Sequence, residues 1–263
     1  MKKYIRILQM GLQNHLEYRG NCFLALLVSF IPFGVNILIW LAAISTSENP
    51  TFTTEGIITY YFLILIVSNL TECNIQYSIS DDIRLGKLNK FLLQPYNYMV
   101  YYLMIDLPKR VVFILVGAVP IGVIYIFLHK YISIEFNMVI MLLFLVSLAV
   151  GYLLNFTLNF LISECSFYFS QVTSLFTSFN VAKGIAAGDI FPLNAFPKNI
   201  LAVFAILPFQ YLGYFPVSIL TENISINDII FKIFIGIVWI FVLFGLGCIL
   251  WVKGLKRYAA FSG

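Results

Sequence analysis

Charged residues are scarce in this chain. Lys, Arg, Asp and Glu make up 11% of the 263 residues, against 61% hydrophobic residues, and the mean hydropathy is +0.93. Soluble globular domains carry about a quarter charged residues. The composition therefore excludes an ordinary water-soluble domain and indicates an integral membrane protein. The net charge of +4 is small and gives no indication of a nucleic-acid partner.

Residue types that bind metals or carry out catalysis are also scarce. The two histidines are His15 and His129, and the four cysteines are scattered without a CxxC or Cys/His cluster. Gly86 and Lys87 are followed by Leu88 with no Gly-rich loop before them, so there is no Walker A motif for ATP. Motifs such as HExxH and GxSxG are missing too. We therefore expect no enzyme, and no catalytic, metal or cofactor-binding residue in this chain.

Long apolar runs are abundant. A membrane-spanning helix needs about 20 such residues, whereas the strands of a β-barrel would alternate over short segments. We predict an all-α membrane protein with one transmembrane domain, residues 1–263. Its six predicted spans are residues 22–44, 57–79, 111–128, 138–162, 166–187 and 229–252.

An amphipathic segment and the positions of the basic residues predict how the chain is placed in the membrane. Apolar residues recur at helical spacing from Ile5 to Leu16, which predicts an amphipathic interface helix over residues 1–20. Four Lys or Arg lie before the first span, five in the segment 79–110 and three after the last span. Lys and Arg are retained on the cytoplasmic side. Both termini are therefore predicted to be cytoplasmic, and the composition has the character of a bacterial plasma-membrane protein.

The central cytoplasmic loop, residues 80–110, contains a candidate partner-binding helix. Asp81 or Asp82 can cap a short helix that Pro95 ends. Such a helix would place four apolar residues on one side: Ile83, Leu85, Leu88 and Leu92. A short charged helix below the membrane suits a cytosolic partner, and a solvated linker with snorkelling basic side chains explains the same residues. The local sequence leaves both open.

Three predicted spans carry small or polar residues at every fourth position. They are Ser68, Glu72, Gln76 and Ser80; Ser147, Gly151, Asn155 and Asn159; and Ser166, Ser170, Ser174 and Ser178. Ionisable residues inside spans commonly mark functional sites, but such stripes also serve as helix-packing surfaces. For Glu72, a structural ion pair and a role in a transport pathway both remain open.

Residues 188–227 are apolar but interrupted by four prolines. Pro192, Pro197, Pro208 and Pro216 divide the stretch into pieces too short to cross a bilayer. Broken helices at membrane depth are tolerated where protein buries them. We predict a re-entrant helical pair on the external side, before the last span.

Two stretches together resemble a known family. They are IRLGKLNKFLLQP, from Ile83 to Pro95, and GDIFPL, from Gly188 to Leu193, with further FP and LPF motifs after the second. They resemble the type 2 ABC exporter permeases (the ABC-2 type), in the branch whose membrane subunits stand alone. The resemblance extends over essentially the whole chain.

The resemblance implies partners as well as a fold. Residues 81–94 would form the coupling helix on which a cytosolic ABC ATPase docks, and that ATPase would bind ATP and Mg. A second permease, identical or related, would complete the substrate path. The residues expected at the docking site are Asp81, Arg84, Gly86, Lys87, Leu88, Lys90 and Leu92, and those expected in a pathway or a packing surface are Glu72, Asn155, Asn159, Ser170, Ser174 and Ser178.

Other functions remain possible at this point. An ion-coupled secondary transporter or channel could use Glu72 and the polar stripes. Such transporters often consist of two similar halves, and this chain has no second copy of the Glu72 arrangement. A membrane scaffold or immunity protein is a third hypothesis. The cargo of an exporter, whether peptide, lipid, drug-like molecule or polysaccharide precursor, is left open by the sequence.

Overall fold

The computed structural model describes residues 2–46, 52–132 and 137–261, and every regular element in these ranges is a helix. The longer helices are α1 (Lys2–Glu17), α2 (Arg19–Thr46), α3 (Thr54–Thr71), α7 (Pro108–Leu128), α8 (Met138–Ser163), α9 (Thr173–Ala187) and α12 (Ile226–Phe261). The shorter ones are α4 (Ile75–Arg84), α5 (Leu88–Leu92), α6 (Tyr98–Asp106), α10 (Lys198–Ile206) and α11 (Tyr214–Thr221). Three 3-10 turns complete the set: η1 (Glu164–Phe167), η2 (Leu193–Ala195) and η3 (Pro208–Leu212).

Five helical segments within the described ranges are long and apolar enough to cross a membrane. They are Arg19–Thr46, Thr54–Arg84, Tyr98–Leu128, Met138–Phe167 and Ile226–Tyr258. The predicted all-helical membrane architecture is confirmed. The predicted number of six spans is not confirmed.

The difference lies in the segment predicted as the fifth span, residues 166–187. Its helix α9 begins only at Thr173 and has 15 residues, about 22 Å, against a hydrocarbon core of about 30 Å. The first residues of the predicted span instead continue α8 as η1, where Ser166 and Phe167 are buried. The chain then reverses over residues 168–172. Packing of η1 against α12 and α4 thus moves the turn beyond residues 163–165, which separate the predicted fourth and fifth spans.

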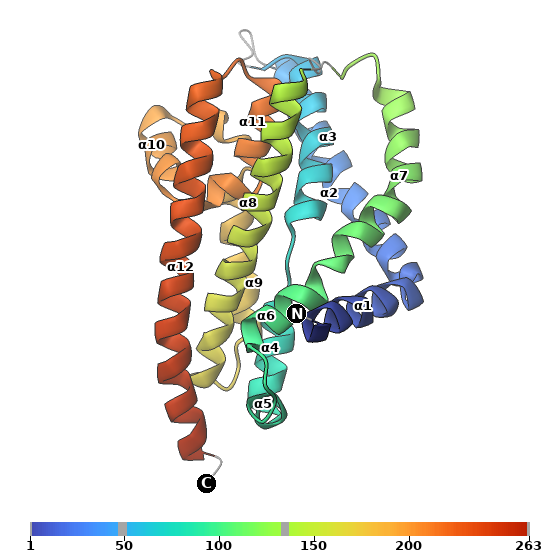
Figure 1. Ribbon diagram of the computed structural model, residues 1–263. Helices are drawn as coiled ribbons and strands as arrows, with labels where there is room; N and C mark the ends of the chain where they lie inside the picture. Colours follow the sequence, from blue (N-terminus) through green and yellow to red (C-terminus); the bar gives the residue numbers. More distant parts are fainter. Residues whose placement is uncertain (1, 47–51, 133–136, 262–263) are drawn as a thin grey trace.

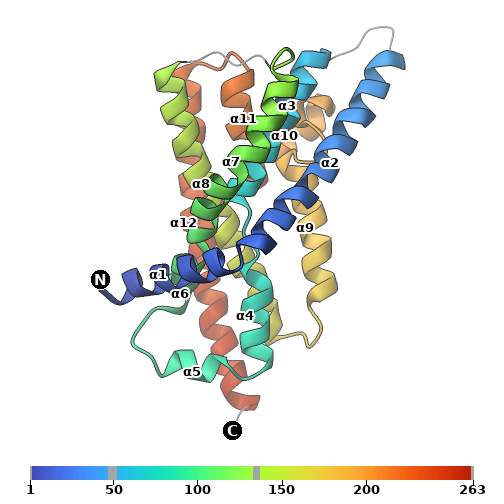
Figure 2. The ribbon, with the colours of Figure 1, turned by 90° about the vertical axis from the view of Figure 1, so that its right-hand side faces the viewer.

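The helices form a bundle in which several of them pack against α8 (Figure 1). α12 packs along α8, and α3 and α11 also pack on α8. α1 lies across the bundle below α2 and α7, as the view in Figure 2 shows, and it packs against α6 and α7. α2 is the most exposed of the spanning helices, because Leu26 is its single buried residue.

The buried side chains gather in two clusters. The upper cluster includes Tyr61, Leu154 and Tyr211 and joins α3, α8, η3, α11 and α12. The lower cluster includes Leu88, Tyr98 and Phe160, with Trp251 packed against it. It lies at the end of the bundle where α4, α5 and the last turns of α12 are found (Figure 1). The segment predicted as a cytoplasmic loop is therefore packed against the rest of the protein.

The four prolines of residues 188–227 lie at the starts of short elements. Pro192 and Pro197 directly precede η2 and α10, Pro208 opens η3, and Pro216 lies in the first turn of α11. Proline lacks the backbone N–H that a helix interior needs, so it is best tolerated at such positions. α11 is largely buried, whereas α10 has no buried residue and lies on the outside (Figure 1).

A close backbone contact joins α8 to this region. A Cβ atom on Gly151 would lie 2.6 Å from the carbonyl oxygen of Tyr211. Real Cβ atoms do not approach oxygen this closely, so η3 can pack on α8 only where a side chain is missing. By contrast, a Cβ atom on Gly245 of α12 would meet nothing within 4 Å.

This contrast generates a stability prediction. Gly151→Ala should force η3 away from α8 and lower the free energy of unfolding by about 1–3 kcal/mol, the usual cost of overpacking. Gly245→Ala is the matched control and should unfold like the wild type. The thermal unfolding midpoints of the purified proteins in mild detergent measure the effect, and equal midpoints for the two variants would contradict the tight contact.

Candidate functional site

The second span is broken in its polar half. α3 ends at Thr71 and α4 begins at Ile75, and Glu72 leaves the helix with φ −58° and ψ 133°. The predicted continuous stripe from Ser68 to Ser80 is therefore interrupted. A helix end leaves its last carbonyl oxygens without intrahelical partners. In a bilayer these oxygens need partners from the protein.

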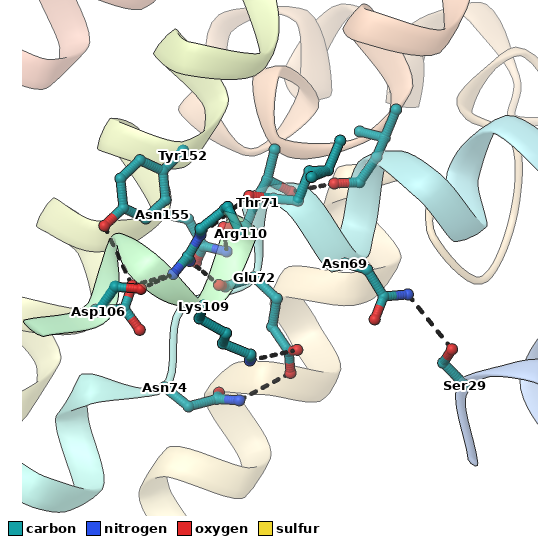
Figure 3. A network of polar contacts seen from close by, with 12 residues as sticks. Ser29, Asn69, Thr71, Glu72, Asn74, Asp106, Lys109, Arg110, Tyr152 and Asn155 are labelled. Atoms are coloured by element: carbon teal, nitrogen blue, oxygen red, sulfur yellow. Dashed lines mark hydrogen bonds and ion pairs between the residues drawn. The ribbon is translucent and has the colours of Figure 1, made fainter. Parts of the chain in front are cut away.

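Two side chains from other helices supply the partners. The Arg110 guanidinium at the start of α7 donates to the carbonyl oxygen of Leu70, at 3.2 Å, and to that of Glu72. The Asn155 amide on α8 donates to the carbonyl oxygen of Thr71, at 2.9 Å. These bonds converge on the break from two sides (Figure 3). The break is thus a stabilised feature of the fold.

Arg110 is itself held by a buried ion pair. Its guanidinium bonds the Asp106 carboxylate one turn earlier, and the two side chains are 11% and 12% exposed. The Tyr152 hydroxyl donates to the same carboxylate at 3.2 Å, and the guanidinium carbon lies 4.1 Å from the centre of the Tyr152 ring. A buried charge is tolerated when it is paired and hydrogen-bonded. The network joins α3, the end of α6, α7 and α8 around the break.

The Glu72 side chain forms a second, more exposed ion pair. Its carboxylate lies 3.2 Å from the Lys109 ammonium and accepts a hydrogen bond of 2.8 Å from the Asn74 amide. The Glu72 and Lys109 side chains are 47% and 31% exposed. Glu72 therefore forms the structural pair considered from the sequence, and it also borders a cavity.

A polar cavity of about 310 Å³ lies beside the break. Its charged wall residues are Glu72, Lys183 and Asp189, and amide and hydroxyl side chains of α2, α3, α8 and α9 form most of the remaining wall. These residues are far apart in the sequence and meet only in the folded chain. Because the bundle is mostly apolar, a cavity with polar walls is the candidate functional site. We call it the polar cavity.

Lys183 was not singled out from the sequence. Its ammonium donates to the Asn155 Oδ1 atom at 3.0 Å, and the Asn159 amide donates to the same atom at 2.7 Å. Asn155 and Asn159, two sequence candidates, are therefore buried around one oxygen. The spacing of the sequence does place one set of residues on a single helical face: Phe176, Asn180, Lys183 and Ala187. Only the packing of α9 shows that this face is the one turned toward the other helices.

The serine stripe of the predicted fifth span does not form one surface. Ser170 lies before α9 begins, and Ser174 and Ser178 point to the exposed side of α9. None of these three serines borders the polar cavity. In this part of α9 the buried residue is Phe176. The helix therefore turns Phe176 inward and turns the serines away from Asn155 and Asn159.

The motif that begins at Gly188 borders the polar cavity through Asp189. Gly188 ends α9 with φ +87°, a conformation in which a side chain would be strained. The carbonyl oxygens of residues 188, 189 and 190 accept hydrogen bonds from Tyr60, Asn36 and Tyr61, at 2.8, 3.3 and 2.9 Å. The Asp189 carboxylate accepts one from Ser68 at 3.0 Å. Side chains of α2 and α3 thus satisfy this irregular backbone segment.

The predicted docking segment has a different shape from the one expected. α4 runs on to Arg84, Gly86 turns the chain with φ +71°, and α5 follows. Neither aspartate caps a helix start: Asp82 is buried near the end of α4 and accepts hydrogen bonds from the hydroxyls of Tyr98 and Tyr102, at 2.9 and 2.6 Å. The single helix expected from residue 81 is replaced by two helices because tyrosines of α6 bind this carboxylate.

The four apolar residues expected on one side of that helix are also divided. Leu88 and Ile83 are buried, Leu88 completely, in the lower cluster. Leu85 and Leu92 are 65% and 50% exposed. The exposed surface of this segment consists of these two leucines, Leu93 at 87% exposed, and Asp81, Arg84, Gly86, Lys87, Asn89 and Lys90. Leu88 therefore packs inside the protein and is not part of the exposed surface of this segment.

The fold and the site define a class of protein: an all-helical integral membrane protein with a polar cavity between its helices and a helical projection at one end. Residues 21–262 match the family model described as ABC-2 family transporter protein, and the chain belongs to this family. It is therefore an ABC transporter permease. The match leaves α1 outside it. A search of curated proteins finds no match.

The network at the break predicts unequal roles for two adjacent basic residues. Arg110→Met should lower the free energy of unfolding by about 3–5 kcal/mol, because it removes the cationic partner of the buried Asp106 carboxylate and the donor to two carbonyl oxygens. Lys109→Met removes an exposed ion pair and should cost less than about 1 kcal/mol. Thermal unfolding in the same detergent compares the two variants, and similar losses would show that Arg110 does not hold the break.

Proposed function

We propose that this chain is the membrane permease of an ABC exporter, driven by ATP hydrolysis in separate subunits that dock on α5 and on the turn before it. The observation that carries this proposal is the projection formed by α4 and α5. It exposes three leucines beside three basic residues, Arg84, Lys87 and Lys90. Exposed leucines at the end of a membrane protein suit a protein partner better than water.

The projection is rigidly attached, as a docking element must be if it transmits movement. Leu88 is buried in the lower cluster. The Phe91 ring of α5 lies 4.9 Å from the Tyr101 ring of α6, centre to centre, and the Tyr98 ring lies 4.9 Å from Trp251 of α12. A displacement of α5 therefore moves α4, and α4 leads directly to the break beside the polar cavity. ATP-driven cycling further requires that the ATPase bind the alternative states of the permease with different affinity.

The topology in this proposal has six crossings. α9 and the short elements up to Thr221 together form the fifth crossing and its external end, because α9 alone is too short. Twelve of the sixteen Lys and Arg residues then lie on the cytoplasmic side, including those of the projection. Both termini are cytoplasmic, and the membrane is the bacterial plasma membrane.

The proposal also includes a second permease, identical or related, packed against α2 and α9. In the isolated chain α2 has one buried residue, Leu26, and α9 exposes Ser174 and Ser178. Small and hydroxyl-bearing residues are typical of helix contacts within membranes. A substrate path between the two permeases would run along this side.

An ion-coupled transporter is the second candidate, favoured by the three ionisable residues around the polar cavity. Substrate flux in liposomes that contain the permease alone, driven by a proton or sodium gradient, would establish it. Flux that requires the ATPase and ATP would exclude it as the main activity.

The docking proposal predicts that replacing two exposed leucines weakens ATPase association. Leu92→Asp together with Leu93→Asp should weaken ATPase association about tenfold or more, because each leucine buried at an interface contributes about 1.5–3 kcal/mol. The measurement is co-purification of an ATP-binding-cassette subunit from native membranes in mild detergent, with its ATP hydrolysis. Leu88 is left intact because its replacement would disrupt the lower cluster.

Lys198→Glu provides the control. It introduces a negative charge at an exposed position on α10, away from the projection, and should leave ATPase association unchanged. If the double leucine variant also retains the ATPase at the wild-type level, α5 is not the docking site.

A further inference from the structure

A second, apolar cavity adjoins the polar cavity. This apolar groove has a volume of about 570 Å³ and lies where α1, α2 and α7 meet, with Ala25, Leu26, Phe113 and Val116 in its wall. Ser29, Asn69 and Glu72 border both spaces. The Asn69 amide donates to the Ser29 hydroxyl at 3.4 Å, a contact visible in Figure 3. One polar and one apolar space therefore share a wall of small polar side chains.

The apolar groove is bounded by two helices that have few buried residues. It lies between α2 and α7, which belong to the two least buried of the five spanning segments. Its charged wall residues, Glu72 and Lys109, are paired with each other. Burial lowers the pKa of His15 on α1, which favours the neutral imidazole. The groove thus presents hydrocarbon and small polar surfaces, which suit an alkyl chain.

The polar cavity contains a lysine, Lys183, that forms no direct salt bridge with a described residue. Among the described residues, no carboxylate oxygen lies within ion-pair distance of the Lys183 ammonium, whose hydrogen bond is to Asn155 Oδ1. The two acids of the wall are engaged elsewhere: Glu72 with Lys109 and Asn74, and Asp189 with Ser68. An ammonium has three donors, so Lys183 retains hydrogen-bonding capacity toward the cavity. A lysine between helices of a membrane protein commonly marks a functional site, and its remaining donors favour a group rich in acceptor oxygens, such as an anionic head group.

We propose that the two spaces form one binding site for an amphiphile with an anionic head group. The head group binds Lys183 in the polar cavity, and the alkyl chain lies in the apolar groove between α2 and α7. Both volumes fall within or close to the range of about 300–1,000 Å³ that is usual for ligand pockets. This inference deepens the proposed function by naming a ligand class for the permease. Its test needs no ATPase, so the two proposals can fail separately.

The charge requirement separates this site from ordinary contact with lipid. Any bilayer lipid can place a chain in an apolar groove, and such contact is indifferent to the charge of the head group. A site that depends on Lys183 discriminates between head groups of opposite sign. Binding should therefore need both the anionic group and the alkyl chain.

The experiment measures equilibrium binding to the full chain in nanodiscs of zwitterionic lipid. The probes are dodecyl phosphate, dodecyltrimethylammonium and inorganic phosphate, each below its micellar concentration where one exists. We expect saturable binding of dodecyl phosphate alone. Lys183→Met should weaken it about tenfold or more, since hydrogen bonds to a charged group are lost, whereas Lys183→Arg should retain most of it.

Two further variants test the location. Ala25→Trp, at an exposed groove position, should obstruct the alkyl chain and weaken binding without disturbing the core, while Lys130→Met removes an exposed lysine outside both spaces and should have no effect. Unfolding midpoints of all variants establish that they are folded.

The outcomes that overturn the inference are distinct. Equal binding of dodecyltrimethylammonium would eliminate the anionic head group, and equal binding of inorganic phosphate would reduce the site to a simple anion site. Wild-type affinity in Lys183→Met and Ala25→Trp would eliminate the location. If no ATPase co-purifies with the chain from native membranes while amphiphile binding is intact, the exporter proposal is overturned and the amphiphile site stands.

Discussion

Hydrogen bonding of backbone carbonyls at membrane depth is the constraint on which the rest of this structure depends. Three consecutive carbonyl oxygens are freed where the second span breaks, and water cannot be relied on to satisfy them. Arg110 and Asn155 supply the donors. Arg110 can do so only because Asp106 and Tyr152 neutralise and orient it. The break therefore fixes the positions of α3, α4, α7 and α8 relative to one another.

The same requirement explains the polar cavity. Three further carbonyl oxygens are freed at residues 188–190, directly after α9, and side chains of α2 and α3 satisfy them. The two irregular segments come close together, since Ser68, just before the break, binds Asp189. Polar side chains are needed around both. Those that remain partly free, above all Lys183, face the space between the two segments, and that space is where a ligand can be recognised.

The break also gives α4 a separate role. A continuous second span would join α5 to the upper part of the bundle through one helix, whereas here α4 belongs with α5, α6 and the end of α12 in the lower cluster. The projection and the lower wall of the polar cavity are consequently parts of one packed unit. An event at the projection can thus reach the cavity through contiguous contacts, which is the physical basis of the coupling we propose.

The sequence by itself determined the membrane class, the helical architecture and the short elements around the prolines, because hydropathy, helix length and proline geometry are local properties. Its motifs also resembled those of the family. It did not reveal the break, since Ser68, Glu72 and Gln76 keep a helical spacing through it. Nor could it show that Leu88 is buried while Leu92 is exposed, that α9 starts at Thr173, or that Lys183 faces inward. Only the tertiary structure decided these points, because the partner of a polar group or the neighbour of a leucine lies far away in the chain: Arg110 is 38 residues from Glu72, and Asn155 is 84 residues from Thr71.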